Sequence, residues 1–311
     1  MLPLLLPFLT DTVIAPPEDY NEIFVNEWGV VVFTSEGVSV TGAPGENGDL
    51  YFGRYPFGPM MVDAPVVWIH GADFEKARFT VTANQGELTV LYPEPDFLDD
   101  DGYVTTAGWD ITTEPAVECD ETAFPSSEGV PFQWAMPLWR EVPSRELYSS
   151  ETGEHLGNFL YYEAAMYLWQ PPDDIYDPAI LAGYYATEGL SITTGDELEI
   201  ERVQLVPLPG GNPRELLDDQ GVNEILCGWA AGRLKSSEIE ALWNTWKPFF
   251  QTNPAVDDLV VDRRGTGERW LLFPLPWDEV ERISSINICF PGRDDIIINY
   301  NRLFLGLVRV Y

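Results

Sequence analysis

The sequence predicts a β-dominated α+β protein: an antiparallel β-sandwich over residues 21–208, followed by a helical hairpin and a small mixed sheet over residues 209–311. Three observations lead to this prediction. Short runs of β-branched and aromatic residues alternate with turn residues through the first segment. After residue 208 the apolar residues recur at helical spacing, and after residue 258 strand-like runs return. Residues 1–20 stand apart as an apolar arm or a degenerate signal peptide.

The clearest hairpin pattern is ARFTVTANQGELTVLY, in which residues 77–83 and 88–92 flank the turn Asn84-Gln85-Gly86. Apolar and polar side chains alternate along both arms, so one face is packed and the other is solvated, as in antiparallel sheets. A second hairpin is predicted over residues 189–203. Between the two hairpins, residues 125–178 are dense in Trp, Tyr and Pro, which favours long ordered loops with short strands over helices.

Two amphipathic helices are predicted in succession. The first begins at Asn212-Pro213, a cap followed by a first-turn proline, and buries one face of residues 222–230. The second begins at Ser237, with Glu240 completing a capping box, and ends near Pro248. A short helix is also expected at residues 277–282, among four strands at 259–261, 270–273, 286–290 and 303–311. The last of these, LFLGLVRVY, is apolar on both faces and is therefore expected to be a central strand.

The charge balance excludes two classes of partner. The chain has 17 Lys and Arg residues against 51 Asp and Glu residues, a formal net charge of -34. Nucleic acids and anionic membrane surfaces both require cationic patches, so neither is expected to bind. The acidic surface is interpreted as a solvated coat that maintains solubility. A saline or calcium-containing environment would also screen the repulsion between carboxylates, and both alternatives stay open.

The first residues, MLPLLLPFLTDTVIAPP, form the only candidate targeting segment in the sequence. Pro3 and Pro7 interrupt the apolar run, no cationic residue precedes it, and Pro16 follows the small residues that would form a cleavage site. Either a signal remnant or an ordered arm fits this pattern. No run of about 18 apolar residues is present, so no transmembrane helix is predicted. In the arm interpretation, the side chains that would insert into a neighbouring sheet are Leu4, Leu5, Leu6 and Phe8.

Several stretches together resemble an uncharacterised family of exported bacterial proteins. They are NEWGVVVF, the hairpin ending in YPEPD, GWDI, EHLGNFLYYEAA, SSEIEALWNTWKPFF, LLFPLPWDEVERI and LFLGLVRVY, in the order in which they occur between residues 24 and 311. Members of this family carry an EWG motif near the start of the mature chain and a C-terminal strand that contains Arg-Val. The resemblance implies export and one continuous architecture, and it implies no chemistry. Asn26 and Glu163 depart from the expected His and Arg, which puts any ligand role of those family positions in doubt.

Two carboxylates are candidates for catalysis. Glu27, between Asn26 and Trp28, and Glu163, among aromatic residues, are expected to be partly buried, and burial raises the pKa of a carboxyl group. Two such groups beside aromatic walls are what a glycoside hydrolase requires. The alternative is that each carboxylate simply accepts hydrogen bonds from backbone groups or arginine. If both lay in one cleft the hydrolase hypothesis would be favoured, whereas opposite positions would count against it.

The acidic loop PDFLDDDGY suggests a weak calcium site formed by Asp96, Asp99 and Asp101, although it lacks the EF-hand pattern. No other cofactor is expected. His70 and His155 are the only histidines, and neither belongs to a metal-binding or catalytic motif, so hydrogen-bonded or exposed positions are predicted for both.

These observations favour a non-catalytic binding or structural protein of the cell envelope that contacts protein or glycan. An extracytoplasmic or secreted setting is expected, with a cytoplasmic one as the alternative. A carboxylate-based, glycosidase-like hydrolase and a self-assembling subunit that donates its N-terminal strand are the alternative functions. The balance of motifs favours a protein that is not an enzyme, because no nucleophile or phosphate-binding motif is present.

Overall fold

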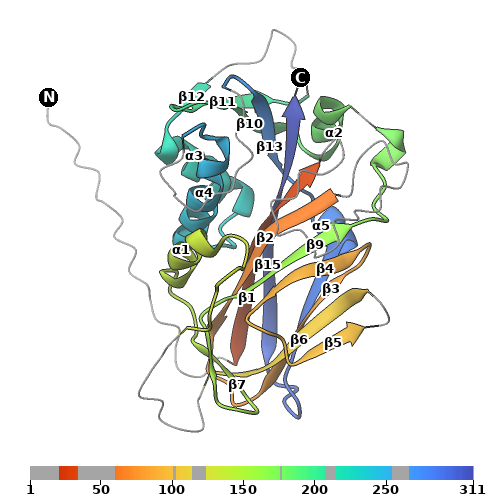
Figure 1. Ribbon diagram of the computed structural model, residues 1–311, viewed down its shortest axis with the longest axis vertical. Coiled ribbons are helices and arrows are strands. Elements are labelled where there is room, and N and C mark those ends of the chain that lie inside the picture. The colour runs from red at the N-terminus through yellow and green to blue at the C-terminus, as the bar shows by residue number, and fades with distance from the viewer. Residues whose placement is uncertain are drawn as a thin grey trace, which may run out of the picture.

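A computed structural model of the protein describes residues 21–33, 60–100, 103–113, 124–175, 177–206, 215–253 and 266–310. Within these ranges the strands form two sheets, which we call the large sheet and the small sheet (Figure 1). The fold is β-dominated and belongs to the α+β class, as the sequence predicts.

The large sheet draws its strands from almost the whole described chain. In spatial order it contains β12 (Glu215–Leu217), β11 (Glu199–Gln204), β10 (Glu188–Thr193), β13 (Arg269–Pro274), β15 (Ile297–Val310), β1 (Glu22–Phe33), β2 (Met60–Gly71), β9 (Leu160–Met166) and β4 (Glu87–Tyr92). Neighbouring strands in this order are antiparallel except β1 and β15, which are parallel. β15 therefore lies at the centre of the sheet, which confirms the prediction for the apolar C-terminal run.

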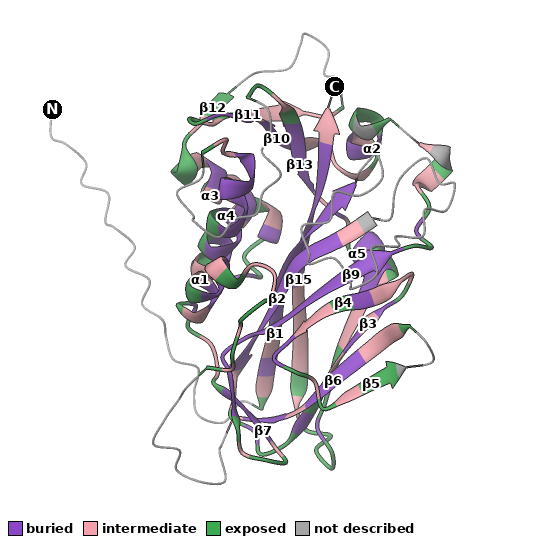
Figure 2. Ribbon diagram, viewed as in Figure 1, coloured by how far each residue is buried: buried purple, intermediate pink, exposed green. Residues whose placement is uncertain are grey.

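The small sheet packs face to face against one side of the large sheet. Its strands are β14 (Ser284–Cys289), β3 (Ala77–Ala83), β6 (Val104–Thr112), β7 (Leu147–Ser149) and β8 (His155–Gly157), with β5 (Phe97–Asp100) paired to β6. Phe79 and Trp109 of the small sheet share one buried cluster with Val25 and Ile69 of the large sheet. This cluster is the core of the sandwich, and it explains the alternation of buried and exposed positions along β3 (Figure 2).

Helices cover the other face of the large sheet. α3 (Asp219–Ala230), α4 (Ser236–Phe250) and the short α1 (Met136–Arg140) bury their apolar sides in a second cluster with Trp28 and Trp68 (Figure 1). α2 (Pro178–Tyr185) and α5 (Trp277–Ile283) instead contribute side chains to the core between the sheets. Short 3-10 turns at Gln133–Ala135 and Pro172–Asp174 complete the described helical segments. The large sheet is therefore the middle layer of three.

The predicted pairing of residues 77–83 with 88–92 is wrong, although both strands form. β3 pairs with β6 and β14 in the small sheet, while β4 pairs with β9 in the large sheet. At the crossing, the backbone N–H of Asn84 donates to Ile283 O at 2.9 Å and its side chain donates to Glu281 O at 2.7 Å. A Cβ on Gly86 would lie 1.8 Å from Ala165 O, so only glycine fits this approach to β9.

The second hairpin is confirmed, since β10 and β11 are antiparallel neighbours. The start of the first helix at Asn212-Pro213 is wrong, because Glu215–Leu217 forms strand β12 and α3 follows it. The Asp218 carboxylate caps α3 by accepting the Gly221 N–H at 2.9 Å. The second helix is confirmed, but Glu238, and not Glu240, accepts the backbone N–H of Lys235 at its N-terminus.

Both sheets take strands from both sides of residue 208, so the expected boundary there does not separate one sheet from another. Of the strands expected after residue 258, β13 and β15 belong to the large sheet, whereas β14 belongs to the small sheet. The strand expected at 259–261 and the arm at 1–20 lie outside the described residues. In the described ranges, no helix has the length and apolar character that a bilayer crossing needs.

Candidate functional site

Glu27 points from β1 into the space between the two sheets. Its carboxylate forms an ion pair with Arg302 of the parallel neighbour β15, and both side chains are fully buried. The hydroxyl of Tyr162 on β9 also donates to Glu27, at 2.6 Å. The guanidinium of Arg302 is further held by Ser284 and by Glu281 at 2.7 Å. Each charged atom of this cluster therefore has a partner, which a buried ion pair requires.

The pKa shifts around Glu27 follow from this arrangement. Burial alone would lower the pKa of Arg302. The negative charge of Glu27, and the hydrogen bond that Arg302 donates to it, raise that pKa above the ordinary value. Burial, followed by the Glu27 charge, raises the pKa of Tyr162 well above its ordinary value. Tyr162 is therefore a neutral hydrogen-bond donor, and the cluster has the features of a structural clamp between β1, β9 and β15.

Glu163 lies on the opposite face of the same sheet. Successive residues of a strand point to opposite sides, and Tyr162 faces the small sheet, so Glu163 faces the helices. Its carboxyl group accepts the hydroxyl hydrogen of Tyr161, whose ring packs 5.2 Å from Trp139 of α1. Burial, followed by the nearby charge of Asp63, raises the pKa of Glu163 well above its ordinary value. Burial and the adjacent carboxyl group likewise raise the pKa of Tyr161.

The two predicted acids are therefore separated by the large sheet and do not share a cleft. A glycosidase acid pair needs both carboxyl groups on the two sides of one glycosidic bond. Glu27 is paired with an arginine, and Glu163 is 3% exposed. The arrangement agrees with the alternative in which each carboxylate accepts hydrogen bonds, and the geometric condition set for the hydrolase hypothesis is not met.

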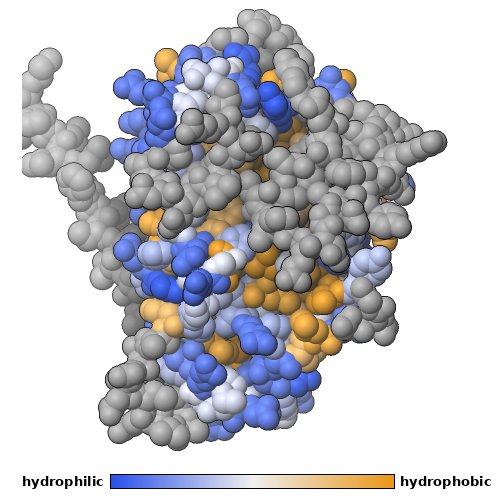
Figure 3. Space-filling model, viewed as in Figure 1, coloured by the Kyte–Doolittle hydropathy of each residue, from blue (hydrophilic) through white to orange (hydrophobic). Residues whose placement is uncertain are grey.

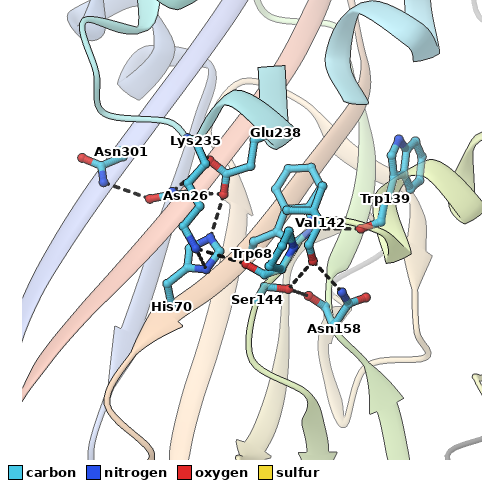
Figure 4. A network of polar contacts seen from close by, with 11 residues as sticks. Asn26, Trp68, His70, Trp139, Val142, Ser144, Asn158, Lys235, Glu238 and Asn301 are labelled. Atoms are coloured by element: carbon cyan, nitrogen blue, oxygen red, sulfur yellow. Dashed lines mark hydrogen bonds and ion pairs between the residues drawn. The ribbon is translucent and has the colours of Figure 1, made fainter. Parts of the chain in front are cut away.

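A second polar cluster lies where α4 begins above β2 (Figure 4). The Lys235 ammonium nitrogen is 2.8 Å from His70 Nδ1 and 3.1 Å from Pro143 O. On the other side of the imidazole, Nε2 lies 2.7 Å from Glu238 Oε1. The three side chains form a continuous chain of hydrogen bonds from the surface to a fully buried carboxylate.

Asparagines on the large sheet fix the buried end of this chain. The amide of Asn26 donates to both oxygens of Glu238 at 3.0 Å, and the amide of Asn301 donates to Asn26 Oδ1 at 2.9 Å (Figure 4). The backbone N–H of Lys235 donates to Glu238 Oε2 at 2.6 Å. With three donor groups around it, from Asn26, the Lys235 backbone and His70, the Glu238 carboxylate has a fixed orientation toward His70.

A groove lies beside α3, at the edge of the large sheet formed by β11 and β12. It has a volume of about 350 Å³. Its lining combines carboxylates, one arginine, one indole, small apolar groups and two helix glycines: Glu188, Arg202, Glu215, Leu217, Gly221, Glu224, Ile225, Gly228 and Trp229. Figure 3 shows mainly hydrophilic atoms over the end of the molecule where β11 and β12 lie.

The groove lining contains more negatively charged than positively charged side chains. Arg202 donates to Glu188 at 2.6 Å, and the Trp229 indole N–H donates to the other oxygen of Glu188 at 3.2 Å. Burial alone would raise the pKa of Glu188, but these two donors bring it below its ordinary value. Glu215 and Glu224 are exposed on the rim. The single arginine is thus already paired, and hydrogen-bond acceptors dominate the lining.

The remaining predicted site residues lie partly outside the described residues. Asp96 accepts the backbone N–H of Asp110 at 2.6 Å, Asp99 is exposed on β5, and Asp101 lies outside the described residues. No three His, Cys, Asp or Glu side chains of the described chain come close enough to hold a metal ion. The predicted assembly residues, Leu4, Leu5, Leu6 and Phe8, also lie outside the described residues.

Sequence reasoning missed both the Lys235 cluster and the groove. His70 was expected to be a hydrogen-bonded or exposed histidine, and it is hydrogen-bonded, but its partners are 165 and 168 positions away. The one local signal was Glu238, three residues after Lys235 at a helix start. For the groove, the signal was a pair of glycines, Gly221 and Gly228, seven residues apart on one helix.

No protein-family model matches the sequence, and no curated protein matches it. Among solved structures, the Fcho1 Mu homology domain of Danio rerio, determined with a bound Eps15 peptide, is a distant neighbour. The two chains are 7% identical, the superposition covers 94% of this chain and 98% of that chain, and the TM-score is 0.28. This likeness is too low to carry an argument about fold or function.

Proposed function

We propose that the protein is a non-catalytic binding protein of the extracytoplasmic side of the cell that holds a glycan in the groove beside α3. The observation that carries this proposal is the groove lining, in which the Trp229 indole stands next to several carboxylates and one paired arginine. The volume of about 350 Å³ lies in the range typical of small-ligand sites.

The lining suits a ligand with many hydroxyl groups. Carboxylates accept hydrogen bonds and cannot donate them, so Glu188, Glu215 and Glu224 favour a donor-rich ligand. The indole and the aliphatic side chains of Leu217 and Ile225 provide an apolar wall for the carbon-bound hydrogens of a sugar ring. Gly228 leaves the helix backbone open, since a Cβ there would meet nothing within 4 Å.

The same charges disfavour anionic ligands. Three carboxylates surround one arginine that is already engaged by Glu188, so a phosphate or sulfate group would meet net repulsion. A basic side chain of a partner protein is compatible with this lining. Glycan is preferred over protein because the site is a concave groove of small volume and not a broad apolar surface.

The extracytoplasmic setting is supported by the resemblance to an exported family and by the acidic surface. Cell fractionation of the source organism, followed by N-terminal sequencing of the mature chain, tests it. The proposal expects the protein in the periplasmic, envelope or secreted fraction. Recovery with cytoplasmic markers alone would overturn this part of the proposal.

Calorimetric titration against a panel of neutral oligosaccharides tests the groove. Replacing Trp229 by alanine is expected to weaken glycan binding by about 2 kcal/mol, or about thirtyfold, as for a central aromatic contact. Trp277, 44% exposed and away from the groove lining, provides the matched control, and Trp277→Ala should bind as the native protein does. Because Trp229 is half-buried, Glu224→Gln and Glu215→Gln at the exposed rim give a second test with little effect on folding.

Salt dependence separates glycan from protein. Glycan binding should change little between low and high salt, because the ligand is uncharged. Binding only to lysine-rich or arginine-rich peptides, lost at high salt, would favour a protein partner instead. The proposal fails if no glycan binds, or if Trp229→Ala and both rim variants bind as tightly as the native chain.

A further inference from the structure

The chain of hydrogen bonds from Lys235 through His70 to Glu238 has the arrangement of a nucleophile, a base and an orienting carboxylate. Lys235 is an exposed residue at the N-cap of α4, and its amine nitrogen is 2.8 Å from His70 Nδ1. His70 is buried, with its Nε2 2.7 Å from Glu238. The cluster is independent of the groove beside α3 and shares no residue with it.

The donors and acceptors in this chain fit one tautomer of His70. Glu238 accepts hydrogen bonds on both oxygens, from Asn26 and from the backbone N–H of Lys235, so it accepts from His70 as well. The imidazole therefore carries its hydrogen on Nε2 and presents the Nδ1 lone pair to Lys235. A proton that arrives at Nδ1 produces an imidazolium, and the buried Glu238 carboxylate stabilises its charge.

The surroundings disfavour the charged form of Lys235. Burial has the largest effect and lowers the pKa of the amine. The Glu238 charge raises this pKa, and the charge of the Arg145 guanidinium lowers it. Arg145 is held beside His70 by its hydrogen bond to Gly71 O at 2.8 Å and by its ion pair with Asp73 at 2.8 Å. A positive group at the N-terminus of α4 also faces the positive end of the helix dipole.

We propose that Lys235 is a nucleophilic amine that binds small aldehydes reversibly as an imine, with His70 as the proton acceptor. The amine lone pair attacks the carbonyl carbon, and a C–N bond forms as the C=O double bond becomes a single bond. His70 Nδ1 takes one proton from the nitrogen and gives it to the oxygen, which yields the neutral carbinolamine. The C–O bond then breaks as the C=N double bond forms, and His70 passes the second nitrogen proton to the departing oxygen, which leaves as water. The sum is amine plus aldehyde giving imine plus water, and no oxidant or reductant is consumed.

Asn26 and Glu238 are positioning residues in this proposal, because they act through the imidazole. Their donor and acceptor pattern keeps Nδ1 directed at the amine. Pro143 O accepts a second hydrogen from Lys235 at 3.1 Å, which restricts the amine to the neighbourhood of His70. Aldehyde is the chemical class that fits, since a primary amine forms imines readily with unhindered carbonyl groups.

The chain supplies internal controls for a test, because its three lysines are Lys76, Lys235 and Lys247. Lys76 is exposed, and Lys247 forms an ion pair with Asp219 at 2.6 Å. The native full chain is treated with limiting propanal and sodium cyanoborohydride, which traps imines as stable propyl amines. Peptide mass spectrometry then gives the rate of modification at each lysine of the same molecule.

We expect Lys235 to be modified about tenfold faster than Lys76 near neutral pH. This is less than the rate increase of about a hundredfold that a positioned general base contributes in enzymes. The advantage should shrink at high pH, where every lysine becomes neutral. His70→Gln keeps a hydrogen-bond acceptor but not a base, and should bring the Lys235 rate close to that of Lys76. Glu238→Gln should lower the Lys235 rate and leave the Lys76 rate unchanged.

Equal rates at Lys235 and Lys76 in the native protein would overturn the proposal. So would a His70→Gln variant that keeps the fast rate at Lys235. An unchanged rate at Lys247, whose ion pair with Asp219 depends on the fold, shows that a variant is folded, so loss of the fold cannot imitate the expected result. Glycan binding in the groove is measured separately, and the failure of either proposal leaves the other standing.

Discussion

Glu27 and Glu163 occupy the two faces of one sheet and are neutralised in different ways. Glu27, facing the small sheet, is paired with the guanidinium of Arg302 and accepts a hydrogen bond from Tyr162. Glu163, facing the helices, has Tyr161 as its hydrogen-bond donor and the carboxyl group of Asp63 nearby. No cation is among the causes of the raised pKa of Glu163.

The comparison shows that burial alone does not define a catalytic acid. A buried carboxylate needs compensation, which can come from a fixed positive charge or from a proton. The ion pair with Arg302 makes Glu27 a structural anion that connects the parallel strands β1 and β15. On the other face, burial and the nearby Asp63 charge raise the pKa of Glu163, which favours its protonated, neutral form. Four predictions test this difference, from the largest expected effect to the smallest.

Replacing Arg302 by methionine should give the largest loss of stability. The variant leaves the fully buried Glu27 carboxylate without its partner, which costs about 3–5 kcal/mol of the free energy of unfolding. Urea unfolding monitored by tryptophan fluorescence measures it. Adding Glu27→Gln to Arg302→Met should restore a large part of the loss, since no unpaired charge remains. A double variant as unstable as the single one would contradict the interpretation.

Gly86→Ala tests the separation of the two sheets. A Cβ at this position would lie 1.8 Å from Ala165 O, a backbone atom of β9, so β4 must shift. We expect a loss of about 1–3 kcal/mol in urea unfolding. The control is Gly228→Ala, where a Cβ meets nothing within 4 Å. If residues 77–92 formed a simple hairpin, Gly86→Ala would be tolerated as well as the control.

Glu163→Gln should change the pH dependence of stability. Between the ordinary pKa of 4.5 and the raised pKa of the folded state, the unfolded chain has lost this proton while the folded chain keeps it. The unfolded state then binds fewer protons, so native stability falls as pH rises, by up to about 1.4 kcal/mol per pH unit for one group.

Glutamine has no such proton to lose. Relative to the native protein, Glu163→Gln should therefore gain stability from pH 5 to pH 8, as measured by thermal melts across that range. Parallel curves for the two proteins would show that Glu163 is ionised in the folded state.

The smallest effect is expected at an exposed ion pair of the small sheet. Arg78 on β3 contacts Asp110 on β6 at 2.6 Å, but solvent reaches both groups. Arg78→Met should leave the thermal midpoint nearly unchanged, because exposed pairs contribute little. A loss as large as that of Arg302→Met would mean that burial does not set the difference between the two arginines.

Local features of the fold were predictable from the sequence. Alternation along 77–83 identified β3, helical spacing identified the buried faces of α3 and α4, and a two-sided apolar run identified the central position of β15. Each of these signals depends on residues close together in the chain.

Pairings between distant segments were not predictable. The turn Asn84-Gln85-Gly86 has typical hairpin composition, but contacts with residues 281–283 and Ala165 direct its two flanking strands into different sheets. Similarly, Asn212-Pro213 has the composition of a helix start, yet Glu215–Leu217 pairs with β11. Tertiary pairing overrides such local preferences.

The candidate site was predictable only in part. Burial of Glu27 and Glu163 followed from their apolar neighbours, and both are buried. Their faces could not be assigned, because a strand shift of one residue exchanges the two sides of a sheet. The cluster of Lys235, His70 and Glu238 depends on α4 lying over β2, and no local sequence pattern predicts that packing.

The most direct test of the central claim is infrared spectroscopy of the carboxyl groups at neutral pH, comparing the native protein with Glu163→Gln and Glu27→Gln. We predict a C=O band of a protonated buried carboxyl group in the native protein that disappears in Glu163→Gln and persists in Glu27→Gln. The absence of such a band in the native protein, or its loss in Glu27→Gln alone, would contradict the account.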